Sequence, residues 1–268
     1  MPPRVSIVTI CRNVRDVIEP TLRSIHGQSY SGIEHVVVDG NSTDGTFELL
    51  RGHASRIAAL VQRPPTGIAD AFNRGIELST GDLVVFVNAG DMFVGPDVIA
   101  RIAQHYVTDS WAWAYGGVRF VSPDGVLSFD RPAAPYSYRD LSRTCFVPHA
   151  SSITSRELFA KFGGFDTSYK TSMDYEFWLR VGQRCPGVPL PFLISQFTTG
   201  GTSFDNRRRY AEDRRARRTH IEMSPSRRFV FETTLRVEAD LLWLAKRALP
   251  TRAQMVLRRW RQRFQELL

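Results

Sequence analysis

The chain has 268 residues, of which 43% are hydrophobic and 23% are charged, and it carries a formal net charge of +8. This size and balance fit one sizeable α/β domain, alone or with an appendage, and exclude a wholly disordered chain. The odd count of three cysteines, without a CxxC spacing, argues against a disulfide framework or a zinc site. No signal peptide and no apolar run long enough to cross a membrane is visible, so we expect a cytoplasmic protein.

Short apolar runs alternate with amphipathic segments through the first part of the chain. Runs that are buried on both faces and separated by helices are typical of parallel strands. The sequence therefore predicts a mostly parallel, Rossmann-like sheet flanked by helices. The predicted strands are 5–10, 34–39, 57–61 and 82–88, and the predicted helices are 14–26, 44–51 (capped by Asp44), 67–79 and 96–106.

The pattern changes after residue 110. Two strands are predicted around a turn within 111–129, followed by helices at 155–166 and 172–183 and by a helical tail at 206–220, 229–249 and 254–268. We therefore predict a catalytic, ligand-binding domain over 1–205 and a basic helical extension over 206–268.

Polar residues follow the predicted strands of the first part. "TICRN" follows the first strand, Asp39 ends the second, Arg63 follows the third, and "NAGD" (88–91) follows the fourth. Ligands of open parallel sheets gather beyond the carboxyl ends of the strands. We expect a polar ligand there, with ring nitrogens, hydroxyls and phosphates, and Asp39 is placed to accept hydrogen bonds from a base or a ribose.

Five segments together resemble the family 2 glycosyltransferases, which have the glycosyltransferase A fold. They are "VSIVTICRN", "VVDGNSTDGT", "GIADAFNRGIELSTGD", "FVNAGD" and "GGFDTSYKTSMDYEFWLR", in the family's order and spacing over roughly residues 4–180. The resemblance implies transfer of a sugar from a nucleotide-diphosphate sugar to an acceptor hydroxyl, usually with inversion. The acceptor class stays open among saccharides, lipid-linked acceptors and natural products.

The resemblance also implies roles for individual residues. Asp174 matches the catalytic base, because an alcohol is a poor nucleophile until a carboxylate takes its proton. Thr9 and Asp39 match nucleoside contacts, and Asp70 and Asn73 match a helix that lines the donor-sugar pocket. The other donor-side candidates are Asn13, Arg63, Asn88, Ala89, Gly90 and His149.

"NAGD" stands where the family places its Asp-x-Asp element, which holds a divalent cation against the donor diphosphate. Here the first acid is Asn88, and Asp91 alone keeps a carboxylate. Mg²⁺ or Mn²⁺ prefers oxygen ligands and accepts few protein carboxylates beside phosphates and waters. Three alternatives stay open: Asp91 binds a divalent cation, binds it weakly, or does not bind one. Glu176 lies two residues from Asp174 and faces elsewhere on a helix, so we assign it a supporting role.

Each assignment has a purely structural alternative. Asp39 is also placed to cap a turn, and Asp91 and Asp174 to cap helices. Asp70 and Asn73 also fit a helix surface. Three tryptophans fit a core better than an acceptor platform: Trp111, Trp113 and Trp178.

The positive charge is concentrated in the tail. Residues 207–268 hold 17 basic and 7 acidic side chains, whereas residues 1–206 hold 18 and 20. Three interpretations stay open: a peripheral contact with the inner face of a membrane, a plain scaffold, and a contact between subunits. The competing functions are a nucleotide-sugar-binding protein without transferase activity and, less favoured, a nucleic-acid-binding protein acting through this tail. A dinucleotide oxidoreductase is disfavoured because no G-x-G-x-x-G follows the first strand.

Overall fold

The computed structural model describes residues 2–64, 66–122, 126, 128–198 and 206–248. The chain forms two compact units, which divide between His220 and Ile221. Helix α8 (Asn206–His220) therefore belongs to the first unit, and the boundary lies later in the chain than the sequence predicts. The second unit contains α9 (Pro225–Ala248), and the predicted helix at 254–268 lies outside the described residues.

The first half of the chain builds the parallel part of the sheet. The strands lie in the order β3-β2-β1-β4, and each neighbouring pair is parallel. Their cores are Val- and Ile-rich and largely buried on both faces, as the continuous apolar runs predict. The strands are β1 (Val5–Cys11), β2 (Ile33–Asp39), β3 (Ala59–Gln62) and β4 (Leu83–Phe86).

The second half extends this sheet with strands of both directions. The order continues from β4 through β8, β6 and β9 to β5, and β7 pairs with β6. The α/β sheet flanked by helices is confirmed, but the described sheet as a whole is mixed, and β5, β8 and β9 were not predicted. The strands are β5 (Asp91–Phe93), β6 (Trp113–Val121), β7 (Ser128–Arg131), β8 (Ser152–Ser155) and β9 (Val188–Thr198).

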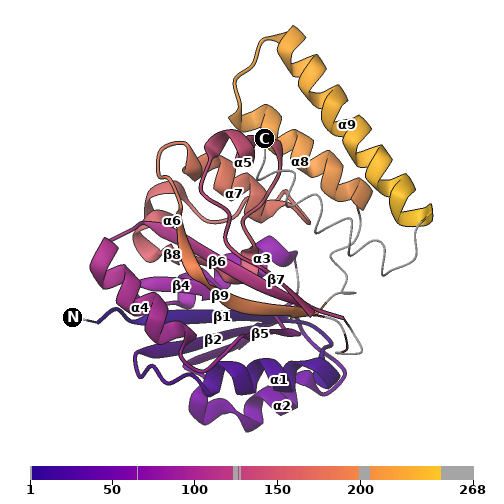
Figure 1. Cartoon of the computed structure of the whole chain (residues 1–268). Coiled ribbons are helices and arrows are strands. Elements are labelled where there is room, and N and C mark those ends of the chain that lie inside the picture. The colour runs from indigo at the N-terminus through magenta and orange to yellow at the C-terminus, as the bar shows by residue number, and fades with distance from the viewer. Residues whose placement is uncertain (1, 65, 123–125, 127, 199–205, 249–268) are drawn as a thin grey trace. The chain divides into compact units, whose positions relative to one another are not determined.

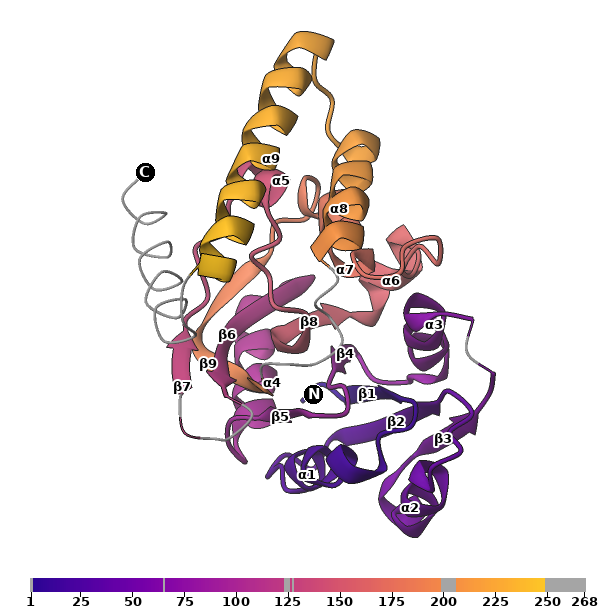
Figure 2. The same cartoon turned by 90° about the vertical axis from the view of Figure 1, so that its right-hand side faces the viewer.

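Helices cover both faces of the parallel strands. Figures 1 and 2 show α1 and α2 on one face and α3 on the other, with α5 to α8 on the side of α3. The second helix begins at Thr46, and Gly45 (φ 90°) occupies the cap position, while Oδ1 of Asp44 accepts the N–H of Thr46 at 3.0 Å. The helices of this unit besides α8 are α1 (Arg15–His26), α2 (Thr46–Gly52), α3 (Ile68–Leu78), α4 (Val98–Asp109), α5 (Tyr138–Arg143), α6 (Arg156–Phe162) and α7 (Met173–Gly182), with 3-10 turns at Ala54–Arg56 and His149–Ser151.

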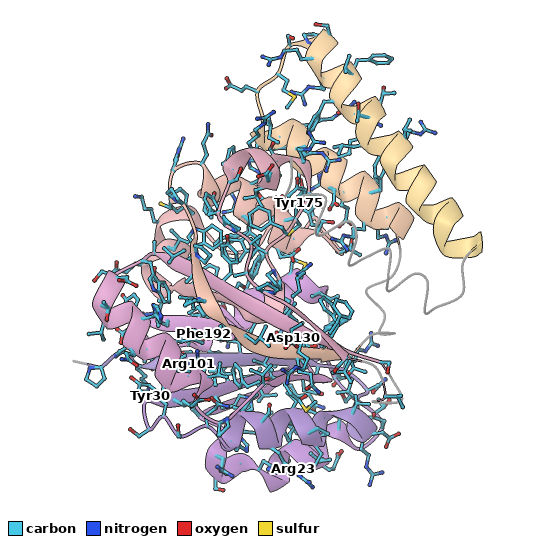
Figure 3. The ribbon with its side chains drawn as sticks, viewed as in Figure 1. Arg23, Tyr30, Arg101, Asp130, Tyr175 and Phe192 are labelled. Carbon is cyan, nitrogen blue, oxygen red and sulfur yellow. The ribbon has the colours of Figure 1, made fainter. Side chains whose placement is uncertain are left out.

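Aromatic side chains fill the core between the sheet and α7. The rings of Trp113 and Trp178 stack with their centroids 4.3 Å apart, and both side chains are buried. Trp111 is buried as well, so all three tryptophans belong to the core, as expected. On the other side of β9, the guanidinium of Arg101 lies 4.1 Å from the ring centroid of Phe192, a contact visible in Figure 3.

A buried carboxylate ties the amino ends of the parallel strands together. Glu34 accepts hydrogen bonds from the hydroxyl groups of Ser6 and Thr80 and from the backbone N–H groups of Thr80 and Gly81. A buried carboxylate is stable when its oxygens are satisfied in this way. These contacts join β1, β2 and the turn before β4 at one rim of the sheet.

Within the described part of the chain, none of the helices has the length and apolar character needed to span a membrane.

Candidate active site

The directions of the strands bring the candidate residues to one rim. β1 to β4 run in the same direction as β6 and β9, and β5, β7 and β8 run the opposite way. The carboxyl ends of the first group and the amino ends of the second therefore share the rim opposite Glu34. Asp39 ends β2, Asn88 follows β4, Asp91 opens β5, and His149 precedes β8.

Asp39 holds the loop that follows β2. Its carboxylate is fully buried and accepts hydrogen bonds from the N–H of Ser42 at 2.9 Å and from Nε2 of Gln62 at 3.1 Å. The Sγ of Cys11 lies 3.6 Å away, and burial together with the charge of Asp39 raises the pKa of that thiol. A direct contact between Asp39 and a nucleobase stays a prediction, and it requires one of these partners to give way.

Asn13, two residues after β1, supports this loop, and Thr9 of β1 supports the neighbouring strand end. Asn13 has a positive φ of 52°, its N–H donates to Oγ of Ser42 and its Oδ1 accepts from the N–H of Thr43, both at 2.9 Å. The hydroxyl of Thr9 is fully buried and donates to the carbonyl of Val87 at 2.8 Å. Asn13 therefore orders the loop, and Thr9 joins β1 to the segment that precedes Asn88.

Two linked histidines, the buried His35 and the half-buried His26, lie directly behind Thr9. Nε2 of His35 is 3.1 Å from the hydroxyl of Thr9, and Nδ1 of His35 is 3.1 Å from Nε2 of His26. Burial, reinforced by the charges of His26 and His53, lowers the pKa of His35 to about 3. Burial and the nearby Arg56 lower the pKa of His26 to about 4.

We therefore expect the protein to lose stability in mild acid. The folded state holds these histidines neutral, so their contribution is full above the unfolded pKa of about 6.5 and is lost as the pH falls toward 4. For His35 alone, the free energy of unfolding should fall by about 2 kcal/mol between about pH 7.5 and about pH 5. Urea unfolding at a series of pH values measures this loss, and His35→Gln should flatten the dependence of the free energy of unfolding on pH.

Arg63, Asp70 and Asn73 form the outer edge of the site. Arg63 and Asp70 make an ion pair at 3.3 Å, and Thr66 donates to the same carboxylate. The side-chain amide of Asn73 accepts from the N–H of Phe165 and donates to its carbonyl, both at 2.8 Å. Asn73 therefore holds the "GGFD" loop against α3. Its side chain has this structural role in addition to the predicted role in the donor-sugar pocket.

The "NAGD" segment is a tight turn with oxygen atoms at both ends. Gly90 has a φ of 94°, which favours glycine, and the N–H of Asp91 donates to the carbonyl of Asn88 at 2.9 Å. Oδ1 of Asn88 is buried without a hydrogen-bond partner among the described residues. Burial raises the pKa of Asp91 to about 7. Ala89 packs against the apolar cluster that includes Cys11, which places this turn beside the end of β1.

The oxygen atoms of this turn fit a hard cation only in part. A buried carboxylate and an unsatisfied amide oxygen are ligands that Mg²⁺ or Mn²⁺ accepts. The described residues contain no cluster of three His, Cys, Asp or Glu side chains that would hold a metal ion by themselves. A cation here would therefore need further oxygen ligands from phosphate or water.

His149 connects this turn to α7. Its ring stacks on Phe86, the last residue of β4, at 5.0 Å, and meets Phe72 edge-on at 4.8 Å. Both ring nitrogens are buried, and neither has a hydrogen-bond partner in the described structure. Burial lowers the pKa of His149, and the nearby carboxylate of Asp174 partly opposes this shift.

Asp174 is the second residue of α7 and is half-buried. Its Oδ1 accepts a hydrogen bond from the N–H of Tyr175 at 2.8 Å. Its charge acts on Cys145 and Asp213, whose pKa values are raised first by burial. Glu176 points elsewhere, to Nε of Arg180 at 2.9 Å and Nε2 of His220 at 2.8 Å, and its supporting role stays a prediction.

The structure thus brings most of the candidates together. His149 links the turn at Asn88 to Asp174, and Cys11 links that turn to Asp39, whereas Arg63 and Asp70 lie farther out beside β3. Sequence reasoning missed the residues that α8 brings beside Asp174, including Arg209, Glu212 and Asp213. The one available signal was a pair of acids, "ED", inside an arginine-rich run.

Comparison with known proteins identifies the family of this chain. The family model described as "Glycosyl transferase family 2" matches residues 6–160. An uncharacterized glycosyltransferase of Mycobacterium tuberculosis, Rv1514c, is 36% identical over 204 residues, covering 74% of this chain and 76% of the relative. A PGL/p-HBAD biosynthesis glycosyltransferase of Mycobacterium bovis is 31% identical over 188 residues, covering 66% of this chain and 69% of the relative.

Two solved structures share the fold. S. aureus TarS 1-349, solved in complex with UDP-GlcNAc, has a TM-score of 0.68 at 16% identity, covering 87% of this chain and 71% of that one. The mannosyltransferase PcManGT from Pyrobaculum calidifontis, solved with GDP-Man and Mn2+, has a TM-score of 0.63 at 22% identity, covering 96% and 79%. The glycosyltransferase A fold is confirmed, and the sequence matches show that this chain belongs to glycosyl transferase family 2.

Proposed function

We propose that this glycosyltransferase moves a sugar from a nucleoside diphosphate sugar to an acceptor hydroxyl with inversion at the sugar carbon. The observation that carries the proposal is the position of His149, whose ring stacks on Phe86, two residues before Asn88, and lies within range of the charge of Asp174. We infer that the Asn88–Asp91 turn faces the donor diphosphate and that the carboxylate of Asp174 takes the proton.

Asp174 is the proposed general base. Its carboxylate takes the proton of the acceptor hydroxyl while that oxygen bonds to the sugar carbon from the face opposite the diphosphate. The bond between that carbon and the diphosphate oxygen breaks, and the nucleoside diphosphate leaves with the electron pair. Asp174 suits this task because it is half-buried, and its hydrogen bond with the N–H of Tyr175 occupies Oδ1 and leaves Oδ2 for the acceptor.

Asp91 and Asn88 are the residues that would hold a divalent cation. A bound cation would offset the charge that develops on the departing diphosphate. The incomplete ligand set of this turn supports a cation that arrives with the donor rather than one held permanently by the protein.

The relatives bear on the choice of donor and acceptor. TarS was solved with UDP-GlcNAc and PcManGT with GDP-Man, which supports a nucleoside diphosphate sugar as the donor here. The relative in PGL/p-HBAD biosynthesis and a putative teichuronic acid biosynthesis glycosyltransferase of Bacillus subtilis support an acceptor in glycolipid or polysaccharide biosynthesis. A lipid-carried acceptor would suit the exposed Phe229 and Val230 of α9, which lie beside Arg227 and Arg228.

Thermal shift measurements test donor binding directly. UDP, GDP and dTDP are each added with and without Mn²⁺, and the true ligand should stabilise the protein by about 2.7 kcal/mol at a hundredfold excess over its Kd. Asp91→Asn should remove the part of the shift that depends on Mn²⁺ and keep the remainder. Asp97→Asn, just before α4, is the matched control. No shift with any nucleotide would contradict the proposed function, and an unchanged Mn²⁺ response in Asp91→Asn would contradict the metal assignment alone.

A further inference from the structure

We infer that Glu212 of α8 is a positioning residue for Asp174, acting by holding the first turn of α7 in place. The inference rests on the proposed role of Asp174 as the base. It assigns a part in catalysis to a helix that carries no residue of the family motifs described above.

The carboxylate of Glu212 accepts hydrogen bonds from the backbone just before α7. Its Oε2 accepts from the N–H of Thr171 at 2.8 Å, from the N–H of Ser172 at 2.9 Å and from the hydroxyl of Thr171 at 2.9 Å. The N–H of Lys170 donates to both oxygens, at 3.0 and 3.1 Å. Three consecutive N–H groups therefore converge on one side chain from another helix.

Helix α7 has no cap of its own at this end. The first N–H groups of a helix lack partners within it, and a side chain at the cap position usually supplies one. Ser172 occupies that position, but its hydroxyl turns to the carbonyl of Arg209 on α8 at 3.4 Å. Glu212 instead accepts from the N–H of Ser172 itself, while the N–H of Tyr175 within the first turn donates to Asp174. The negative charge of Glu212 also suits the positive end of the helix.

The hydrogen bonds keep Glu212 ionised. Burial alone would raise the pKa of its carboxyl group, but the N–H groups of Thr171, Ser172 and Lys170 outweigh burial and lower the pKa below its usual value. The carboxylate of Glu212 is therefore charged at neutral pH. We call its set of hydrogen bonds with residues 170–172 the clasp.

The clasp lies two residues from the proposed base. Asp174 follows Ser172 and Met173, and its own hydrogen bond is to the next N–H along the helix. Its position therefore depends on the first turn of α7. Glu176, also in the first turn of α7, pairs with His220 of α8, and Tyr175, labelled in Figure 3, lies on α7 where α7 meets α8. Glu176 thus holds the side of this turn, while Glu212 holds the backbone that leads into it.

The test measures kcat and KM for release of nucleoside diphosphate from UDP-GlcNAc, GDP-mannose and a dTDP-sugar, which needs no identified acceptor. Glu212→Ala should lower kcat by about 10²-fold, because a shift of about 1 Å in a catalytic group costs that much, with KM changed less than about twofold. Glu212→Gln keeps one carbonyl oxygen for the clasp and should lose about tenfold or less. Glu157→Ala, in the exposed first turn of α6, should keep the full rate.

A double-mutant cycle separates positioning from general loss of structure. If Glu212 acts through Asp174, Glu212→Ala should cost little once Asp174 is Asn, within about threefold, because the two changes affect one function. A full, multiplicative loss in the Asp174→Asn background would overturn the inference, as would an unchanged kcat in Glu212→Ala.

Hydrogen exchange provides a readout that is independent of turnover. In Glu212→Ala, or in Glu212→Gln if the first variant does not fold, the amides of 170–172 should exchange at least about tenfold faster while those of β1 keep their protection. Unchanged protection at 170–172 would overturn the clasp itself. If the unmodified protein releases no nucleoside diphosphate from any donor, the proposed function fails, whereas the exchange result still decides the role of Glu212 in holding α7.

Discussion

Asp174→Asn is expected to reduce sugar transfer by about 10²–10⁴-fold while leaving nucleotide binding nearly intact. Asparagine has almost the same shape, and its carbonyl oxygen still accepts the hydrogen bond from the N–H of Tyr175. The substitution therefore removes the ability to take a proton and little else. Turnover with the donor found by thermal shift measures the first effect, and titration calorimetry with the matching nucleoside diphosphate measures the second.

Asp140→Asn is the matched control, because Asp140 also lies in the first turn of a helix, α5, and is exposed. It should keep the full rate. An Asp174→Asn variant that retains more than about a tenth of the original turnover would exclude Asp174 as the base, since general base catalysis is worth more than that. Loss of nucleotide affinity in the same variant would instead indicate a role in holding the donor.

Trp113→Ala is expected to lower the free energy of unfolding by about 3–5 kcal/mol, at the upper end for a single buried aromatic side chain. Trp113 is fully buried, stacks on Trp178 and donates its indole N–H to the carbonyl of Cys185 at 2.7 Å. Gly187 packs so closely on the ring that a Cβ there would come within 2.4 Å of it. The cavity would therefore be large and bordered by a carbonyl that has lost its donor.

Urea unfolding of the purified variant measures this loss. Phe229→Ala is the control, because Phe229 is 73% exposed on α9 and its removal leaves no cavity. A loss below about 1 kcal/mol for Trp113→Ala would show that the surroundings collapse around the missing ring, contrary to the close packing described here.

The sequence predicts the first half of the fold well because each strand there is a continuous apolar run. β9 was missed because Pro189 and Pro191 demote a strand in sequence reasoning. In the structure both prolines face outward on alternate positions while Leu190 and Phe192 point into the core, so the pleat accommodates them. β5 was missed because three residues are too few for a periodic signal.

The candidate site also has a part that the sequence predicts and a part that it does not. Residues at strand ends are predictable, because a polar side chain that follows a buried strand must lie at the rim of the sheet. α8 was assigned to a separate extension because it has almost no apolar face. It joins the first unit through polar contacts, chiefly those of Glu212 and His220, and charge patterns do not reveal such partners. Glu212, the basis of our further inference, stood out only as one acid of the pair "ED", and its partners could not be predicted for this reason.

The Glu34 cluster has a practical consequence for engineering this enzyme. It lies at the amino ends of the parallel strands, where no candidate residue lies. The amino ends therefore stabilise the sheet, and the carboxyl ends carry the candidate active site. Stabilising substitutions can be sought around Arg4, which pairs with Glu34 at 3.6 Å and donates its backbone N–H to Asp82 at 2.8 Å, without disturbing reactivity. Substitutions meant to change substrate selectivity should be made in the loops at the carboxyl ends of the strands. These loops can vary because the strands are held at their amino ends.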